Sequence, residues 1–195
     1  MMLRSICVFC GSSVGNPEIY ARAAEELGCL LARRGIELVY GGGKTGLMGV
    51  LADACLGGGG KVMGIIPKAL VAKEVAHAGL TELRIVGSMH ERKAMMADLA
   101  HAFIALPGGY GTWDEFCEVL TWSQLGLHQK ACAILNVGGY YDPFLAMADR
   151  ALADGFVRPA HREMVITDTD PARLLHRLET YGVPRVEKWI RRADV

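Results

Sequence analysis

Short apolar runs alternate with longer amphipathic stretches along the chain, a pattern typical of β-α-β proteins with a parallel sheet. Within the runs, apolar residues follow one another instead of alternating with polar ones, as expected for strands that are buried on both faces. Seven runs are predicted to be strands: residues 5–9, 36–40, 61–66, 83–86, 102–106, 130–135 and 164–166. The sequence therefore predicts an α/β fold, a single Rossmann-like doubly wound domain with a mostly parallel sheet of six to seven strands and helices on both faces.

The stretches between these runs carry signals for the ends of helices. Asn16-Pro17 predicts a helix start, with Asn16 as the N-cap and Pro17 in the first helical position, and Gly35 predicts where this helix ends. Ser88 and Glu91 have the spacing of a capping box. We expect one domain over residues 1–182, followed by a basic, amphipathic tail at 183–195 that serves as a packing or subunit arm.

Composition limits the possible classes of function. The chain has 195 residues, 51% of them hydrophobic, which is enough to fill the core of one domain. Lys plus Arg and Asp plus Glu both number 21, so the net charge is zero and we expect no nucleic-acid partner. We also expect no membrane partner, because no apolar run reaches the roughly 18 residues that span a bilayer.

The six cysteines fall mainly inside apolar segments, which indicates reduced core residues of a cytoplasmic protein. Cys7-x-x-Cys10 has no second cysteine or histidine pair to complete a zinc site, and the histidines lack metal-ligand spacings such as HExxH. We therefore expect neither a metal nor another cofactor.

Two glycine turns and one small, hydroxyl-rich turn follow predicted strands. The turn 107–111 precedes an amphipathic run that begins near Thr112, so free backbone N–H groups and the positive end of a helix should point at one place, which suits a phosphate. The turn 41–46 matches the dinucleotide fingerprint GxGxxG, but the next strand ends without the acid that holds a ribose hydroxyl. We interpret Ser12, Gly42 and Gly43 as part of a phosphate or nucleotide site, not an NAD site; turns that serve packing only are the alternative.

Two charged residues are candidates for chemistry. Helical spacing places Arg92 on one stripe with apolar residues, so it should face inward and needs an anionic partner, either a protein carboxylate or a ligand. Glu115 would lie in the first turn of the helix that follows the glycines, and Thr112-x-x-Glu115 has the spacing of a capping box, which would be a purely structural role. In an open α/β sheet, both residues should reach the crevice at the carboxyl ends of the strands.

Three motifs resemble those of the LOG ("lonely guy") family, the cytokinin riboside 5′-monophosphate phosphoribohydrolases. They are GGGKTGLMG at 41–49, MHERK at 89–93 and PGGYGTWDE at 107–115. The resemblance implies a Rossmann-like fold, usually a homodimer, that hydrolyses the N-glycosidic bond of N6-modified adenosine 5′-monophosphates. The products would be the free base and ribose 5-phosphate. Trp113-Asp114 departs from the leucine-glutamate pair of many relatives.

The resemblance also implies roles for individual residues. Arg92 and Glu115 match the catalytic pair, and further positions match contacts to the nucleoside 5′-monophosphate: Glu74, Lys93, Gly109, Tyr110, Gly111, Thr112 and Thr121. This assignment agrees with the chemistry, because cleavage of a C1′–N9 bond builds positive charge on the ribose that a carboxylate can stabilise. From the residues alone, Glu74 is more simply explained as a solvated surface carboxylate.

Other functions remain open at this point. One is an AMP nucleosidase of broad specificity, and another is a non-catalytic nucleotide or cofactor carrier, which the same fold can support. Lysine decarboxylase, a label given to some sequences of this kind, is not favoured. A pyridoxal phosphate enzyme needs a Schiff-base lysine with supporting groups, and the sequence shows no such constellation.

Overall fold

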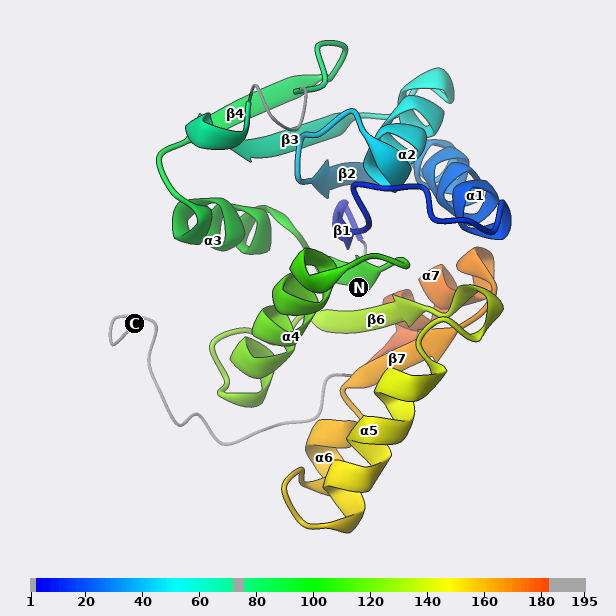
Figure 1. Cartoon of the computed structure of the whole chain (residues 1–195), viewed down its shortest axis with the longest axis vertical. Coiled ribbons are helices and arrows are strands. Elements are labelled where there is room, and N and C mark those ends of the chain that lie inside the picture. The colour runs from blue at the N-terminus through cyan, green and yellow to red at the C-terminus, as the bar shows by residue number, and fades with distance from the viewer. Residues whose placement is uncertain (1–2, 72–75, 183–195) are drawn as a thin grey trace.

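The structure is a computed structural model that describes residues 3–71 and 76–182. Its centre is a seven-stranded, all-parallel sheet with the strand order β4-β3-β2-β1-β5-β6-β7 (Figure 1). The strands are β1 (Ser5–Phe9), β2 (Glu37–Tyr40), β3 (Val62–Pro67), β4 (Glu82–Val86), β5 (Ala102–Ala105), β6 (Ala131–Leu135) and β7 (Val165–Asp168). The predicted fold class is confirmed.

Helices cover both faces of this sheet. They are α1 (Ile19–Arg33), α2 (Gly46–Gly57), α3 (Met89–Leu99), α4 (Tyr110–Gln124), α5 (Asp142–Ala153), α6 (Pro159–Arg162) and α7 (Pro171–Thr180), with short 3-10 helices η1 (Lys68–Leu70) and η2 (Val137–Gly139). One apolar core joins the sheet to α1, α2 and α7, and a second joins it to α3, α4 and the start of α5. The continuous burial of β1, β3, β5 and β6 follows from these two cores.

Two helix starts differ from the prediction. Helix α1 begins at Ile19, because Glu18 takes the N-cap position and pairs with Arg22 instead of Asn16 capping the helix. Helix α4 begins at Tyr110 rather than near Thr112, with Gly109 at its N-cap. The capping of α3 by Ser88 is confirmed by a 3.1 Å bond from the Glu91 N–H. Helix α6 was not predicted, and the tail at 183–195 lies outside the described residues.

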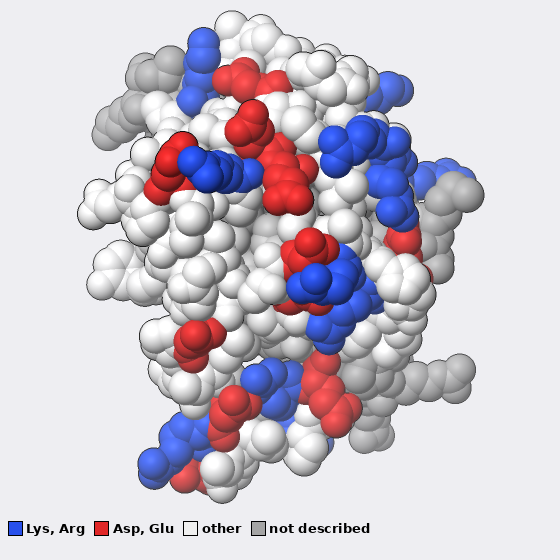
Figure 2. All heavy atoms as spheres, turned by 90° about the vertical axis from the view of Figure 1, so that its right-hand side faces the viewer, with Lys and Arg blue, Asp and Glu red and all other residues white. Residues whose placement is uncertain are grey.

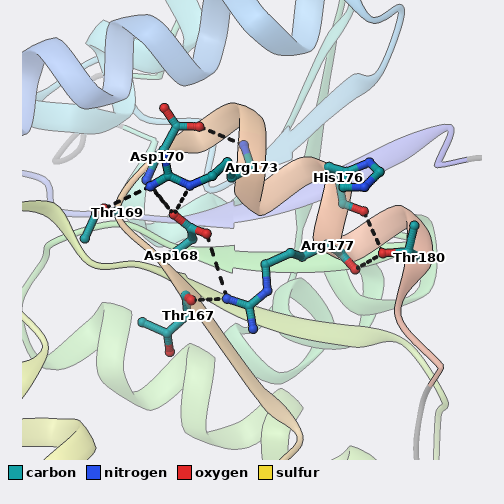
Figure 3. Close-up of polar contacts among 8 residues, drawn as sticks. All are labelled: Thr167, Asp168, Thr169, Asp170, Arg173, His176, Arg177 and Thr180. Atoms are coloured by element: carbon teal, nitrogen blue, oxygen red, sulfur yellow. Dashed lines mark hydrogen bonds and ion pairs between the residues drawn. The ribbon is translucent and has the colours of Figure 1, made fainter.

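The carboxyl end of the edge strand β7 is held by charged side chains of α7 (Figure 3). Asp168 accepts from Arg173 Nη2 at 2.9 Å, and Asp170 caps α7 by accepting from the Arg173 N–H at 2.7 Å. Burial raises the pKa of Asp168, but the bonds from Asp170 and Arg173 outweigh it and leave this pKa lowered. The predicted start of α7 at Asp170-Pro171 is confirmed.

The topology creates one crevice at the middle of the sheet. Strands β1 and β5 are neighbours, with Ile6 beside Ala102 and Phe9 beside Ala105, but α1 and α4 follow them on opposite faces. The loops after β1 and β5 therefore diverge, and ligands of open α/β sheets bind at such a switch point. Elsewhere, on the face seen in Figure 2, basic and acidic groups are intermixed, in keeping with a net charge of zero.

Candidate functional site

Three turns meet at this crevice and are tied to each other through their backbones. Gly11, after β1, donates its N–H to the Pro107 carbonyl at 3.0 Å and accepts from the Leu47 N–H at 3.0 Å. Glycine is required for this approach: a Cβ on Gly108 would lie 2.1 Å from Thr112 Oγ1 and 2.8 Å from the Gly11 nitrogen. The loops after β1, β2 and β5 thus form one continuous backbone surface.

A cavity of about 260 Å³ opens on this surface. The N-terminus of α4 belongs to its wall, and the first turn of a helix presents N–H groups without intrahelical partners, which suits an anion. Its lining residues are Gly11, Ser12, Ser13, Val14, Gly15, Tyr20, Leu47, Pro107, Gly108, Gly109 and Tyr140. Ser12 and Gly109 were predicted to bind substrate; Tyr20 and Tyr140 were not among the predicted residues, because nothing in the sequence distinguishes them from core aromatics.

Arg92 and Glu115 meet between α3 and α4. Arg92 Nη2 lies 3.7 Å from Glu115 Oε1, and the two side chains are only 7% and 12% exposed. Other contacts of the guanidinium are also long, at 3.5 Å to the Gly41 carbonyl and 3.8 Å to Met89 Sδ. Among the described residues, its buried Nε has no hydrogen-bond partner. Since a guanidinium offers five N–H donors, this buried cation keeps the capacity to bind an anionic ligand.

The inward orientation of Arg92 is confirmed, whereas the capping-box interpretation of Glu115 is wrong. Because α4 begins at Tyr110, Thr112 lies inside the helix and is buried, and Glu115 belongs to the second turn. Residues four apart share a helix face, so Glu115 lies on the same face as Gly111. Burial raises the pKa of the Cys10 thiol, and the negative charge of Glu115 adds to this shift.

Lys93 binds two carboxylates of α4. Its Nζ lies 3.0 Å from Glu118 Oε1 and 3.2 Å from Asp114 Oδ2. Burial lowers the pKa of Lys93, but the hydrogen bonds to Glu118 and Asp114 raise it more, so the net shift is upward and the amine stays protonated. In the structure Lys93 joins α3 to α4, and its contact to a substrate stays a prediction.

The glycine turn after β2 supports the arginine. Gly42 has φ +78°, which favours glycine, and its carbonyl accepts from the His77 N–H at 3.0 Å. Gly43 forms an isolated antiparallel bridge with Ala76. Gly41 was not among the predicted site residues, yet a Cβ there would lie 2.1 Å from Arg92 Nη2. The sequence signal that could have identified Gly41 as a site residue is its position directly after a predicted strand.

The remaining predicted residues lie in different surroundings. Tyr110 is 84% exposed, with its ring edge-on to that of Trp113 at 5.2 Å, and Gly111 has open space around it. Thr121 is exposed and donates to the Cys117 carbonyl of its own helix at 2.7 Å, away from the glycine turns along α4. Glu74 lies outside the described residues.

A larger cavity of about 450 Å³ lies at the other end of α4 and contains none of the predicted site residues. It is lined by Ala94, Ala97, Asp98, Trp122, Leu127, His128, Gln129 and Lys130.

No helix in the described part of the chain is long and apolar enough to cross a membrane. Over residues 3–71 and 76–182, no group of three His, Cys, Asp or Glu side chains is placed to hold a metal ion.

Comparison with known proteins gives relatives over most of the chain. The sequence profile of a family described as "Possible lysine decarboxylase" matches residues 48–178. A probable cytokinin riboside 5′-monophosphate phosphoribohydrolase of Oryza sativa subsp. japonica is 54% identical over 178 residues, 91% of this chain and 78% of the relative. A cytokinin riboside 5′-monophosphate phosphoribohydrolase of Arabidopsis thaliana is 49% identical over 185 residues, 95% of this chain and 86% of the relative.

Solved structures show the same fold at lower identity. The molybdenum cofactor binding protein of Rippkaea orientalis has a TM-score of 0.69 at 20% identity and matches 92% of this chain and 98% of its own. The Moco carrier protein of Chlamydomonas reinhardtii has a TM-score of 0.65 at 20% identity and matches 89% of this chain and 98% of its own. The sequence relatives are far closer, and by them the chain belongs to the LOG family, that of the cytokinin riboside 5′-monophosphate phosphoribohydrolases.

Proposed function

We propose that the protein hydrolyses the N-glycosidic bond of N6-modified adenosine 5′-monophosphates, releasing the free base and ribose 5-phosphate. The observation that carries this proposal is the buried pair of Arg92 and Glu115, 3.7 Å apart, beside a backbone surface built from three turns. The relatives that share about half of this sequence are named for the same reaction.

The residues divide the chemistry between them. The glycine turns and the N-terminus of α4 hold the 5′-phosphate. As the C1′–N9 bond breaks, positive charge grows on the ribose, and the Glu115 carboxylate stabilises it and orients the attacking water. Water supplies a hydroxyl to C1′ and a proton to the departing base. Arg92 uses its spare N–H groups to hold the substrate's phosphate or ribose in register with Glu115.

The contacts of Lys93, the lysine among the predicted site residues, make it a poor candidate for a Schiff-base lysine. A Schiff base requires a neutral amine, whereas two carboxylates keep Lys93 protonated. A cofactor carrier of the kind named in the structural comparison has the same fold, but fold alone does not define function. Release of a base separates a hydrolase from a carrier.

The test is a base-release assay with AMP and isopentenyl-AMP. Wild type should release base from the N6-modified nucleotide faster than from AMP, and equal rates would indicate a broad AMP nucleosidase. Arg92→Ala and Glu115→Gln should fold normally and release base at least ~100-fold more slowly, the lower end for a positioned acid–base or electrostatic group. Glu82→Gln, an exposed carboxylate of β4 paired with Arg84, is the matched control and should be unaffected. A carrier would bind nucleotide without releasing base.

We also propose that the protein acts as a homodimer in the cytoplasm. The exposed aromatic pair Tyr110 and Trp113 supports a subunit contact on α4, beside the site. The free thiols, four of them buried, support a reducing compartment.

A further inference from the structure

A buried histidine lies behind the glycine turn that supports Arg92. His77 is 5% exposed, and its ring uses both nitrogens: Nε2 is 2.8 Å from Asp53 Oδ1 on α2, and Nδ1 accepts from the Gly79 N–H at 3.1 Å. Because Nδ1 accepts, the proton of the neutral ring lies on Nε2, which donates to Asp53. These bonds fix both the position and the tautomer of the ring.

The backbone around His77 is bonded to the turn itself. The His77 N–H donates to the Gly42 carbonyl at 3.0 Å, and Ala76 pairs with Gly43 in an antiparallel bridge. His77 thus joins the turn 41–43, through its backbone, to helix α2, through its side chain; α2 begins at Gly46, three residues after this turn.

Arg92 contacts the same turn. Its Nη2 lies 3.5 Å from the Gly41 carbonyl, and a Cβ at Gly41 would lie only 2.1 Å from this nitrogen. The guanidinium therefore packs directly against backbone, and a small displacement of the turn changes its distance to Glu115, now 3.7 Å. An unbroken series of contacts runs from Asp53 through His77 and the glycines to the arginine.

We propose that His77 and Asp53 are positioning residues for Arg92, which they hold in register with Glu115 by fixing the turn 41–43. Neither residue is placed at the reacting bond. The proposal rests on the proposed function for its catalytic consequence, but its structural consequence can be measured without any substrate.

The first test observes Arg92 in the free protein. The Nε–H cross-peak of Arg92 in a 1H–15N NMR spectrum is assigned by its loss in Arg92→Lys. We expect this peak to shift or broaden in His77→Ala and in Asp53→Ala. It should return toward its wild-type position in His77→Gln, whose amide can still donate to Asp53. His176→Ala removes an exposed ring of α7 and is the matched control, which should leave the peak unchanged.

The second test is a double-mutant cycle on base release. His77→Ala should lower kcat/KM about tenfold when Arg92 is present, since misplacement by about 1 Å can cost up to 100-fold. In the Arg92→Ala background it should have almost no further effect, whereas a merely destabilising change would act equally in both. Equal losses in both backgrounds, or an unchanged Arg92 peak in His77→Ala, would overturn the proposal. If wild type releases no base, the proposed function fails, and the NMR experiment alone decides the positioning role.

Discussion

Arg92 combines deep burial with weak protein contacts. Charge-assisted hydrogen bonds are usually about 2.7–2.9 Å long, whereas the guanidinium of Arg92 lies 3.5–3.8 Å from its polar neighbours. Its buried Nε lacks a hydrogen-bond partner in the described part of the chain. Leaving a buried polar group unpaired costs about 1–3 kcal/mol, and more for a charged one. An anionic substrate would remove this cost by pairing with the guanidinium. Arg92 therefore lowers the stability of the free protein but favours the binding of an anion.

The close approach of Gly41 to Arg92 leads to a prediction for Gly41→Ala. The new Cβ would lie 2.1 Å from Nη2 and 3.3 Å from Met48 Sδ, so the guanidinium must move. We expect the free energy of unfolding to fall by about 1–3 kcal/mol and base release to fall at least ~10-fold, because the arginine is misplaced. Gly57→Ala, at the end of α2 with open space around it, is the control and should lower neither the stability nor the rate of base release. Wild-type activity in Gly41→Ala would contradict a requirement for this placement.

Sequence patterns predicted the surroundings of some candidate site residues correctly and those of others wrongly or not at all. The apolar stripe around Arg92 correctly placed it inward, because periodicity reports which face of a helix is buried. The interpretation of Thr112 and Glu115 as a capping box was wrong, because α4 starts before Thr112. Any threonine and glutamate three residues apart have this spacing, so the spacing alone does not locate a helix start. Gly41 and Arg92 are 51 residues apart in the sequence. Local sequence patterns carry no information about a contact between residues so far apart.

Helix α4 links the phosphate turn to the carboxylate. Because α4 starts at Tyr110 instead of Thr112, Gly111 belongs to its first turn and lies one turn before Glu115, which pairs with Arg92 of α3. The strands and the order of the elements along the chain were predictable, because apolar runs and the glycines that end helices and strands are local signals. The starts of α1 and α4 were not predictable, because the N-cap positions are taken by Glu18, whose side chain forms no capping bond, and by Gly109, which has no side chain.

The open face of α4 gives a prediction for Gly111→Ala. A Cβ at this position meets no atom within 4 Å, and alanine favours a helix over glycine by about 0.5–1 kcal/mol. We therefore expect an unchanged or slightly higher midpoint of thermal unfolding. If the substrate lies against this face, the added methyl group should weaken AMP binding about tenfold, equivalent to about 1.4 kcal/mol. Calorimetric titration measures the affinity, and unchanged affinity would place the substrate elsewhere.

Across the whole molecule, the site is a consequence of strand order. Only the pairing of β1 with β5 brings the turns at 10–13 and 107–111 together, and sequence patterns predicted the strands but not which of them are neighbours. The general rule for open α/β sheets gave the crevice. Backbone bonds join the turns there, and Arg92 contacts Gly41 in the turn after β2.

The subunit contact proposed on α4 gives a prediction about size. Sedimentation should yield twice the 21.1 kDa of one chain. Trp113→Glu places a charge on the exposed aromatic pair and should shift the protein toward the monomer, because a charge desolvated at an apolar interface is unfavourable. Phe156→Glu alters an exposed apolar residue that follows α5 and serves as the control. Equal dissociation of the two variants would contradict a contact at Trp113.

The stability of the folded molecule should depend on pH through His128. Burial lowers the pKa of this histidine from 6.5 to about 4, while its Nε2 donates to the Val119 carbonyl at 2.8 Å and its Nδ1 accepts from the Lys130 N–H at 3.1 Å. Below pH 6.5 His128 becomes protonated in the unfolded chain, whereas in the folded protein it stays neutral down to about pH 4. The free energy of unfolding should therefore fall as the pH drops through this window.

The size of this effect follows from the shift, at about 1.36 kcal/mol per pKa unit. Because the ring is partly exposed, at most about 3 kcal/mol should be lost between pH 7 and pH 4. His128→Gln keeps an amide donor for Val119 but cannot titrate, so urea unfolding should show a flatter pH dependence than in wild type. His176→Gln, at the exposed surface of α7, should keep the wild-type slope. Parallel curves for wild type and His128→Gln would show that the folded protein protonates this ring as readily as the unfolded chain does.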